Sequence, residues 1–413
     1  MTSERADVVI VGAGAAGLFA GITAGRAGTG QHIVLLDGAR KLGAKILVAG
    51  GGRCNVTHDV VDAEAYAGSS RNAIRKVLRR FDVPQTIAFF REMGVELKRE
   101  ETGKLFPVTD SAQTVLDALF NALGRTGARV DHPCRVEQIT REGADFVVSG
   151  EWGSIRARRV VLATGGKSLP KSGSDGSGYQ LAAALGHQIT QRVFPALVPL
   201  TLPREHFICT LSGITVPTTL EVRASSGKRL AAFTDSTLCT HFGLSGPSVL
   251  DISRYYLDAL ADDAGTQLVI NWLPDETSET FEAGLGAAGK LSAGRTLARR
   301  LPERLAQALC AAAGVEAQTP VGQLTRDARR ALTRAVTALL LPISGNRGYT
   351  YAEVTAGGIP LADIRLETME SRVCPGLHLC GEICDVDGRI GGYNFQWAWA
   401  SGYVAGVGVI SDE

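Results

Sequence analysis

The order of apolar and polar positions near the start of the chain predicts a strand, a helix and a second strand. Residues Asp7–Val11 are almost wholly apolar, which is typical of a short strand buried on both faces of a parallel sheet. An alanine-rich stretch of helical composition runs to about Ala27, and His32–Leu36 is a second apolar run. This alternation predicts a β-α-β unit, and therefore an α/β fold with a parallel sheet.

The turn between the first strand and the helix carries a glycine fingerprint. Gly12, Gly14 and Gly17 follow the spacing GxGxxG, and the second strand ends on Asp37. Such glycines permit a tight turn, close approach of a pyrophosphate and close packing of the helix on the strand. The helix N-terminus favours phosphate, and Asp37 can accept hydrogen bonds from a ribose. The unit is therefore predicted to bind an adenine dinucleotide.

The pattern changes twice in the middle of the chain. From Arg192 to about Trp272, prolines separate short β-branched runs, which predicts an antiparallel β unit. Residues 274–342 are rich in Ala, Leu and Arg, with leucines at helical spacing and almost no strand signal. We therefore expect an α/β domain of residues 1–191 and 359–413, a β insertion of residues 192–273 and 343–358, and a helical insertion of residues 274–342.

Composition narrows the class of protein. Glycine makes up 49 of 413 residues, about 12% against roughly 7% in average usage, and its clusters suggest backbone contact with a ligand. The net charge of +1 argues against general binding of polyanions. Eight scattered cysteines show neither a CxxC pair nor a metal-ligand spacing, so we expect reduced thiols, no metal and a cytoplasmic location. No uninterrupted apolar stretch is long enough to predict a membrane span.

A second motif, GGGRC, occupies residues 50–54. Three successive glycines each lose about 0.5–1 kcal/mol more than alanine on ordering, so contact of the backbone with a ligand explains them better than a plain turn. Arg53 is a candidate partner for a phosphate or an anionic substrate. Cys54 is either a proton donor beside a redox centre or a small buried thiol, and both interpretations stay open.

Two further glycine turns are typical of flavoproteins. The strand Val160–Leu162 leads into the ATGG turn at 163–166, and a strand ending at Leu379 leads into Gly381 and Glu382. In such folds the acid meets the ribityl chain. The helix after Gly391 and Gly392 can direct its N–H groups at the flavin N1–C2=O edge, which becomes negative on reduction. Cys380 and Cys384 are four residues apart, which disfavours a redox disulfide. His241 is either an acid/base group or a structural histidine.

Taken together, these segments resemble one bacterial family, the BaiN/RdsA-type flavoproteins, also called aminoacetone oxidase-like NAD(P)/FAD-dependent oxidoreductases. The strings that carry the resemblance include KILVAGGGRCNVT at 45–57, THFGLSGP at 240–247 and GEICDVDGRIGGYNFQWAWASGYVAG at 381–406. The resemblance implies a Rossmann-like FAD-binding domain, a β-barrel-like domain and a small helical domain. The chain departs from the family pattern at Asp37 (usually Glu), His58 (usually Asn) and Lys104 (usually Arg).

The resemblance also implies a function and a set of site residues. We expect an oxidoreductase that holds FAD and passes a hydride through flavin N5, with NAD(P)H as a transient electron donor. The expected catalytic residues are Cys54, His241 and Tyr393. The expected cofactor contacts are Gly12, Gly14, Ala15, Ala16, Gly17, Asp37, Gly38, Lys45, Gly51, Gly52, Arg53, Cys54, Ala163, Thr164, Gly165, Gly166, Gly381, Glu382, Asp387, Gly391, Gly392, Tyr393 and Asn394.

The substrate class stays open between a small molecule and ribosomal RNA. Family members have been linked to small amines, to steroid-like enones and to uridine of ribosomal RNA, which is reduced to dihydrouridine. Residues 290–334 hold nine Lys or Arg against three acidic residues. Such an excess of positive charge fits a module that faces a polyanion, although basic helix faces are often merely solvated. The sequence predicts neither the choice of NADH or NADPH nor the oligomeric state.

Overall fold

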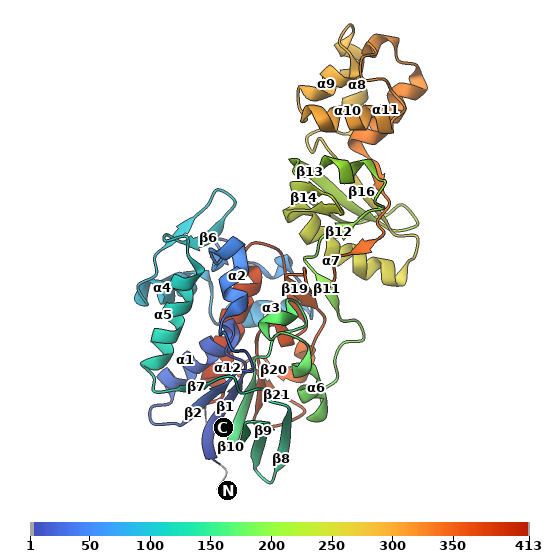
Figure 1. Ribbon diagram of the computed structural model, residues 1–413. Coiled ribbons are helices and arrows are strands. Elements are labelled where there is room, and N and C mark those ends of the chain that lie inside the picture. The colour runs from blue at the N-terminus through green and yellow to red at the C-terminus, as the bar shows by residue number, and fades with distance from the viewer. Residues whose placement is uncertain (1–3, 412–413) are drawn as a thin grey trace. The chain divides into compact units, whose positions relative to one another are not determined.

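The computed structural model describes residues 4–411 (Figure 1). The chain divides into two compact units. The first ends at Pro195 and resumes at Glu353, and the second is Ala196–Ala352. These boundaries lie within a few residues of the expected ends of the α/β domain at 191 and 359. The further division of the second unit into a β domain and a helical domain stays a prediction.

The first unit is built around a parallel sheet. Its five parallel strands lie in the order β22-β10-β1-β2-β7, as expected for a Rossmann-like fold. Their bounds are β22 (Leu377–Leu379), β10 (Gly153–Leu162), β1 (Glu4–Val11), β2 (Ile33–Leu36) and β7 (Arg129–Asp131). The sheet is extended antiparallel by β20 (Ile364–Arg365) and β21 (Glu370–Ser371), and by the hairpin β8 (Gln138–Glu142) and β9 (Asp145–Gly150).

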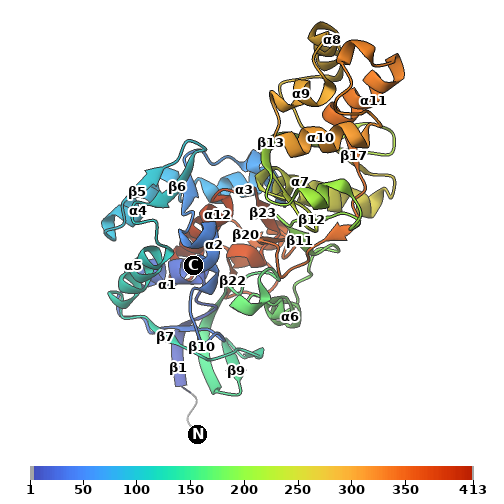
Figure 2. The same ribbon diagram turned by 45° about the horizontal axis from the view of Figure 1, so that its top comes forward.

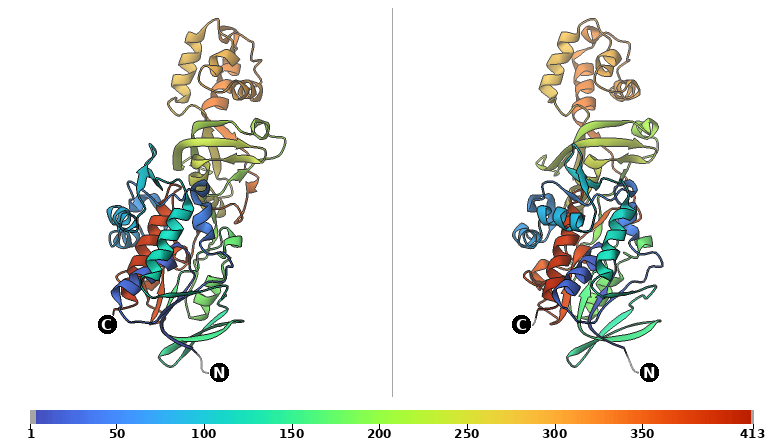
Figure 3. Two further views of the ribbon diagram at one scale, coloured as in Figure 1. Left: turned by 60° about the vertical axis from the view of Figure 1, so that its left-hand side comes forward. Right: turned by 90° about the vertical axis from the view of Figure 1, so that its left-hand side faces the viewer.

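Three long helices lie side by side in this unit (Figure 3). They are α1 (Ala15–Ala27), α5 (Ala112–Gly124) and α12 (Tyr393–Gly408). The closest approach is between α12 and α1. A side chain at Gly402 would begin 2.6 Å from the carbonyl oxygen of Ala16, and one at Gly406 would begin 2.5 Å from that of Ala20. The small residues of α12 permit this close contact with α1.

Shorter elements complete the first unit. The helices are α2 (Ala44–Gly52), α3 (Arg71–Leu78), α4 (Val83–Glu92) and α6 (Ser177–Ala184). A three-stranded sheet holds β3 (Thr57–His58), β6 (Lys104–Pro107) and β5 (Leu97–Arg99), and two strand pairs join β4 (Tyr66–Gly68) to β23 (Val386–Gly388) and β11 (Phe194–Ala196) to β19 (Val354–Ala356).

The second unit combines an antiparallel sheet with helices (Figure 2). The strands, in sheet order, are β17 (Leu339–Leu341), β16 (Gln267–Asn271), β13 (Thr215–Arg223), β14 (Arg229–Thr240), β15 (Gly243–Ser245), β12 (Leu200–Thr201) and β18 (Gly345–Asn346). The helices are α7 (Pro247–Asp262), α8 (Ser278–Ala288), α9 (Ala293–Ala298), α10 (Glu303–Ala312) and α11 (Arg326–Thr337). The barrel-like closure implied by the resemblance stays a prediction.

One part of the helical range is corrected. Residues 274–342 were expected to be a helical insertion with almost no strand, but α11 ends at Thr337 and Leu339–Leu341 pair with β16 as an antiparallel strand. A run of three leucines has no period of its own, and the open edge of β16 decides its conformation. None of the helices between residues 4 and 411 combines the length and apolar character needed to cross a lipid bilayer.

The contact between α12 and α1 predicts a stability effect. Gly402→Ala places a methyl group against the backbone of Ala16, so we expect the free energy of unfolding to fall by about 1–3 kcal/mol. The measurement is urea unfolding followed by tryptophan fluorescence. The matched control is Gly124→Ala in α5, where no atom lies within 4 Å and stability should not fall. Equal urea midpoints for the two variants would contradict the close packing of α12.

Candidate functional site

The predicted glycine turns meet at one edge of the parallel sheet because four strands end level. Val11 lies opposite Leu36 and Leu162, and Leu162 lies opposite Leu379. Backbone hydrogen bonds continue one residue further: Gly12 N–H donates to Leu36 (2.8 Å), Ala163 N–H to Val11 (2.9 Å) and Cys380 N–H to Leu162 (3.0 Å). The carboxyl ends of parallel strands are where α/β folds bind ligands, so this edge is the candidate site.

The three fingerprint glycines differ in what requires them. Gly12 has φ +102°, and a Cβ there would lie 2.5 Å from the oxygen of Ala163. A Cβ at Gly17 would lie 1.9 Å from the oxygen of Gly12, so the fold itself excludes a side chain at both positions. Gly14, just before Ala15 at the start of α1, has an ordinary extended conformation and no protein atom within 4 Å of a Cβ. Only a ligand that approaches the backbone would need glycine there.

Asp37 holds the glycine turn in place. Its carboxylate accepts hydrogen bonds from Ala13 N–H (2.7 Å) and from Ala39 N–H (2.8 Å). Each carboxylate oxygen keeps capacity for one more donor, such as a ribose hydroxyl. Gly38 packs closely on Arg135, because a Cβ there would lie 3.1 Å from the Arg135 side chain. Asp37 therefore has a structural role, and the expected ribose contact stays a prediction.

Two buried hydroxyl groups beside the 163–166 turn lack a partner. The side-chain oxygens of Thr164 and Ser174 are buried and make no hydrogen bond with the described residues. Gly165 and Gly178 bring the backbone against them, since a Cβ would lie 2.7 Å from the Ser174 hydroxyl and 1.8 Å from that of Thr164. A buried hydroxyl without a hydrogen bond costs about 1–3 kcal/mol, which favours a ligand partner.

Glu382 links three segments at this edge. It forms an ion pair with Lys45 of α2 and accepts a hydrogen bond from Thr355 N–H (3.0 Å). Gly166 packs against the same carboxylate, since a Cβ there would lie 2.9 Å from Glu382 Oε1. The acid expected to meet a ribityl chain is thus already engaged with protein groups, and that contact stays a prediction.

Gly381 is held in place by two side chains of α12, Ser401 and Trp397, that no motif in the sequence marked. Gly381 N–H donates to the Ser401 hydroxyl (2.9 Å), and its carbonyl accepts from Trp397 Nε1 (3.0 Å). Gly381 also has φ +77°, and a Cβ would lie 2.7 Å from the Ala16 Cβ. These contacts bring the N-terminal part of α1 and the 381–382 turn together.

Two more side chains of α12 anchor the strand β3. Gln396 accepts hydrogen bonds from the hydroxyls of Thr57 (2.7 Å) and Thr86 (2.9 Å), and Trp399 Nε1 donates to the carbonyl of Val56 (2.8 Å). A buried glutamine between two aromatic residues, Phe395 and Trp397, is unusual, because its amide must be hydrogen-bonded. That polar position was the one signal in the sequence that could have identified this anchor.

The GGGRC segment adopts a left-handed turn. Gly50, Gly51 and Gly52 have φ of +58°, +69° and +87°, which interrupts the helical geometry of α2. A Cβ at Gly50 would lie 2.8 Å from the Phe106 ring, whereas one at Gly51 would meet no atom within 4 Å. Gly51 needs glycine for its conformation and leaves room beside the backbone.

Arg53 is engaged by protein groups. Its guanidinium lies 2.7 Å from Glu100 and 3.6 Å from Asp110, and it stacks 4.0 Å above the centre of the Phe106 ring. A phosphate or an anionic substrate at Arg53 would have to compete with these two carboxylates. The predicted anion contact is therefore weakened by the structure.

Cys54 lies in the hydrophobic core of the first unit. The residue is fully buried, and burial raises the pKa of its thiol to about 12. Its φ of +59° is strained for a residue with a side chain. All eight cysteines are free, and burial raises the pKa of Cys380 to about 12 and that of Cys384 well above its usual value. A disulfide between Cys380 and Cys384 is absent from the described structure.

The N-terminus of α12 contacts the strand β3. Gly391 and Gly392 have φ of +121° and +99°, and a Cβ at Gly392 would lie 2.5 Å from the backbone of Thr57. The Tyr393 ring stacks on His58 with 4.9 Å between ring centres, and the Tyr393 carbonyl accepts from the Tyr66 hydroxyl (2.7 Å). Tyr393 is thus held in place at the first turn of the helix.

Two predicted polar contacts lie just before and inside this helix. Asn394 brackets the backbone of Gly388, accepting from its N–H (2.8 Å) and donating to its carbonyl (2.9 Å). Asp387 is buried in β23.

Within residues 4–411 no group of three His, Cys, Asp or Glu side chains is arranged to hold a metal ion.

His241 belongs to the second unit, on the turn between β14 and β15. It is exposed and meets the Phe242 ring edge-on, 5.1 Å between centres. Beside it, the Arg347 guanidinium lies 4.4 Å from the centre of Phe242 and 3.8 Å from that of Tyr351. The acid/base and structural interpretations of His241 both stay open.

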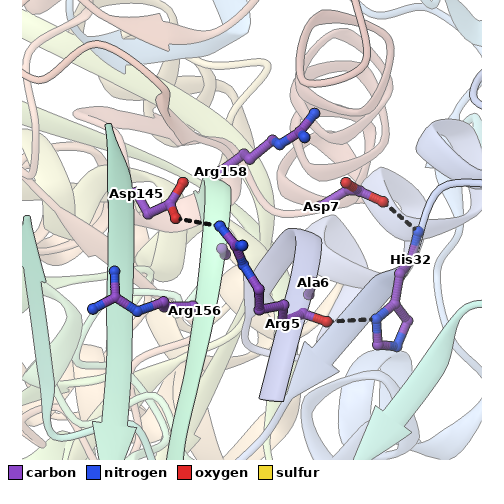
Figure 4. Close-up of a pocket in the computed structure, with 8 residues that line it drawn as sticks. Arg5, Ala6, Asp7, His32, Asp145, Arg156 and Arg158 are labelled. Carbon is purple, nitrogen blue, oxygen red and sulfur yellow. Dashed lines mark hydrogen bonds and ion pairs between the residues drawn. The ribbon is translucent and has the colours of Figure 1, made fainter. Parts of the chain in front are cut away.

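A polar pocket of about 240 Å³ lies at the opposite end of the parallel strands (Figure 4). Its lining residues are Arg5, Ala6, Asp7, His32, Asp145, Arg156, Ala157 and Arg158. Arg5 pairs with Asp145 (2.8 Å), and Asp7 accepts from His32 N–H (2.9 Å). Because this pocket flanks the amino end of β1, it is separate from the glycine turns and their chemistry.

The sequence of the chain is similar to those of known proteins along almost its whole length. The chain is 34% identical to 3-dehydro-bile acid delta(4,6)-reductase of Clostridium scindens over 96% of this chain and 97% of the relative. It is 35% identical to ribosomal RNA dihydrouridine synthase of Escherichia coli over 99% of both chains.

Solved structures share the fold at low sequence identity. An E. coli quinol fumarate reductase has a TM-score of 0.52 at 16% identity, over 98% of this chain and 70% of that one. The 3-ketosteroid delta1-dehydrogenase of Sterolibacterium denitrificans has a TM-score of 0.53 at 13% identity, over 98% and 99% of the two chains. The HI0933-like protein Rossmann domain matches residues 6–408, which confirms the resemblance found in the sequence, and the chain belongs to this HI0933-like family.

Proposed function

We propose that the chain is an FAD-dependent oxidoreductase that moves a hydride between NAD(P)H or an organic substrate and flavin N5. One observation carries the proposal: three glycine turns and Asp37 follow the carboxyl ends of neighbouring parallel strands, and no protein atom lies within 4 Å of a Cβ placed on Gly14. Membership of the family supports the same conclusion.

The residues at this edge fit a dinucleotide. Gly14 leaves the backbone open at the N-terminus of α1, where unpaired N–H groups and the helix dipole favour a pyrophosphate. Asp37 keeps hydrogen-bonding capacity for a ribose, and the hydroxyls of Thr164 and Ser174 need donors or acceptors. Ala15, Ala16, Gly165 and Gly166 contribute backbone to the same edge, and α12 offers its N-terminus at Gly392 and Tyr393.

When bound, FAD supplies a centre that accepts and returns a hydride. The chain's own residues bind and orient the reactants. Tyr393 is fixed by its stack on His58, so it can hold a substrate group beside the first turn of α12. We propose reduction of a carbon–carbon double bond as the reaction, since two relatives are named for reductions, one of bile acid 4,6 bonds and one that yields dihydrouridine.

A side chain introduced at Gly14, where the backbone is not covered by protein, tests the cofactor site. The parent should purify yellow with FAD, and Gly14→Val should weaken FAD about a hundredfold, or about 3 kcal/mol, because its side chain takes the space of the pyrophosphate. Flavin fluorescence titration measures the affinity, and circular dichroism should show an unchanged fold. Gly124→Val, at another position with open space and without a positive φ but outside the site, serves as the control. Normal FAD affinity in Gly14→Val would overturn the assignment.

The two interpretations of Cys54 predict different kinetics. We expect Cys54→Ala to keep FAD and to oxidise its reduced flavin with the organic acceptor at the parent rate, because a buried thiol with a pKa of about 12 donates a proton poorly at neutral pH. Stopped-flow absorbance at the flavin band measures this half-reaction. Cys380→Ala, which removes another buried thiol with a pKa of about 12, is the matched control. A hundredfold slowing confined to Cys54→Ala would establish the proton-donor role.

A second candidate is reduction of uridine in ribosomal RNA. The observation that favours it is a stripe of arginines on α11: Arg326, Arg330 and Arg334 are exposed and spaced four residues apart, which places them on one helix face. Among the described residues, none of the three forms an ion pair with a carboxylate. Unpaired arginines on one face suit contact with successive phosphates.

Charge reversal separates the RNA candidate from a small-molecule substrate. If the enzyme acts on RNA, Arg330→Glu should weaken binding of a ribosomal RNA fragment. The slope of log affinity against log salt concentration should also become shallower by about 1, the value expected for the loss of one phosphate contact. Flavin reduction by NAD(P)H should stay unchanged. Lys228→Glu, an exposed basic residue on a turn of the same unit, is the control. If the parent binds this RNA no better than Arg330→Glu, the arginine stripe does not bind RNA and the second candidate loses its support.

A further inference from the structure

Lys104 stands out among the basic residues near the GGGRC turn and α12. Lys45, Arg53, Lys98 and Arg99 each form an ion pair, with Glu382, Glu100, Asp110 and Asp59 respectively. Lys104 is half-buried, and within residues 4–411 it forms none of the ion pairs that its basic neighbours make. Its ammonium group, which has three N–H donors, is therefore available to an anion that binds beside it.

The side chain of Lys104 reaches the turn that precedes α12. Lys104 begins β6 and pairs with His58 of β3. From there its Cε lies 3.4 Å from the position of a Cβ on Gly391, and the Tyr393 and His58 rings lie 3.6 and 3.7 Å from the same position. These three side chains therefore lie around Gly391, two residues before the first residue of α12.

The turn at Gly391 lies beside both a helix N-terminus and a lysine side chain. The N-terminus of α12 carries the positive end of its helix dipole, and Lys104 adds a full charge beside it. Asp387, four residues before Gly391, is buried in β23. Asp59, which follows His58, is bound by Arg99 and lies 3.0 Å from His58 Nδ1. Two positive groups therefore converge on one turn, and Lys104 forms no ion pair within residues 4–411.

We propose that Lys104 stabilises the negative charge that the flavin N1–C2=O edge acquires when the flavin accepts a hydride, and so raises the reduction potential of the bound cofactor. This inference rests on the proposed function, because it requires FAD at the N-terminus of α12. Lys104 is a positioning residue for charge and takes no proton from the substrate. A hydride adds two electrons to the flavin, and Lys104 keeps its own proton throughout.

The test compares Lys104→Met and Lys104→Gln with the parent holoenzyme. Both variants should keep FAD and bind sulfite, a probe that places negative charge on the same edge, about tenfold more weakly. Their midpoint potentials should fall by about 30 mV, which corresponds to a tenfold change in the equilibrium constant for reduction of a two-electron couple. Lys104→Arg should restore both values.

Lys98→Met is the matched control, since it removes the same charge from the neighbouring strand β5, where the ammonium group is paired with Asp110. It should leave sulfite affinity and potential unchanged. If both Lys104 variants retain FAD with parental sulfite affinity and potential, the inference is wrong while the proposed function stands. If the parent binds no FAD, both fail together.

Discussion

The first unit depends on direct contact between the backbones of neighbouring elements, which is possible only where glycine leaves no side chain between them. The oxygen of Gly12 lies only 1.9 Å from the position of a Cβ on Gly17, and the oxygen of Ala163 lies 2.5 Å from that of a Cβ on Gly12. The strand β1, the helix α1 and the turn after β10 can meet only because these positions lack a side chain. The same condition recurs at Gly402 and Gly406, where α12 lies against the carbonyls of α1.

The local part of this arrangement could be predicted from the sequence. Asp7–Val11, the helix to Ala27 and the strand that ends at Leu36 were identified because burial on both faces and glycine spacing leave a strong pattern over few residues. The level ends of the strands follow from parallel pairing. The Rossmann-like α/β fold and the family were confirmed on this basis.

What could not be predicted are pairings between distant residues. Arg53 meets Glu100 and Asp110 through the hairpin of β5 and β6, and Glu382 meets Lys45 across more than three hundred residues. Such contacts leave no periodic pattern in the sequence. Arg53 and Glu382 were therefore expected to be available to a ligand, although both are engaged in ion pairs within the protein. The strand at Leu339–Leu341 shows the same effect for backbone, since an open sheet edge overrode a locally ambiguous run.

The first unit is assembled from two separate parts of the chain, and this has a consequence during synthesis. The strand β22, the turn at Gly381 and Glu382, and α12 all lie beyond Glu353, so the ribosome makes them after the whole second unit. Until then, β10 lacks its partner β22 and α1 lacks the helix that covers it. The nascent unit therefore exposes apolar surface for the time needed to make and fold the second unit, which creates a need for protection from aggregation.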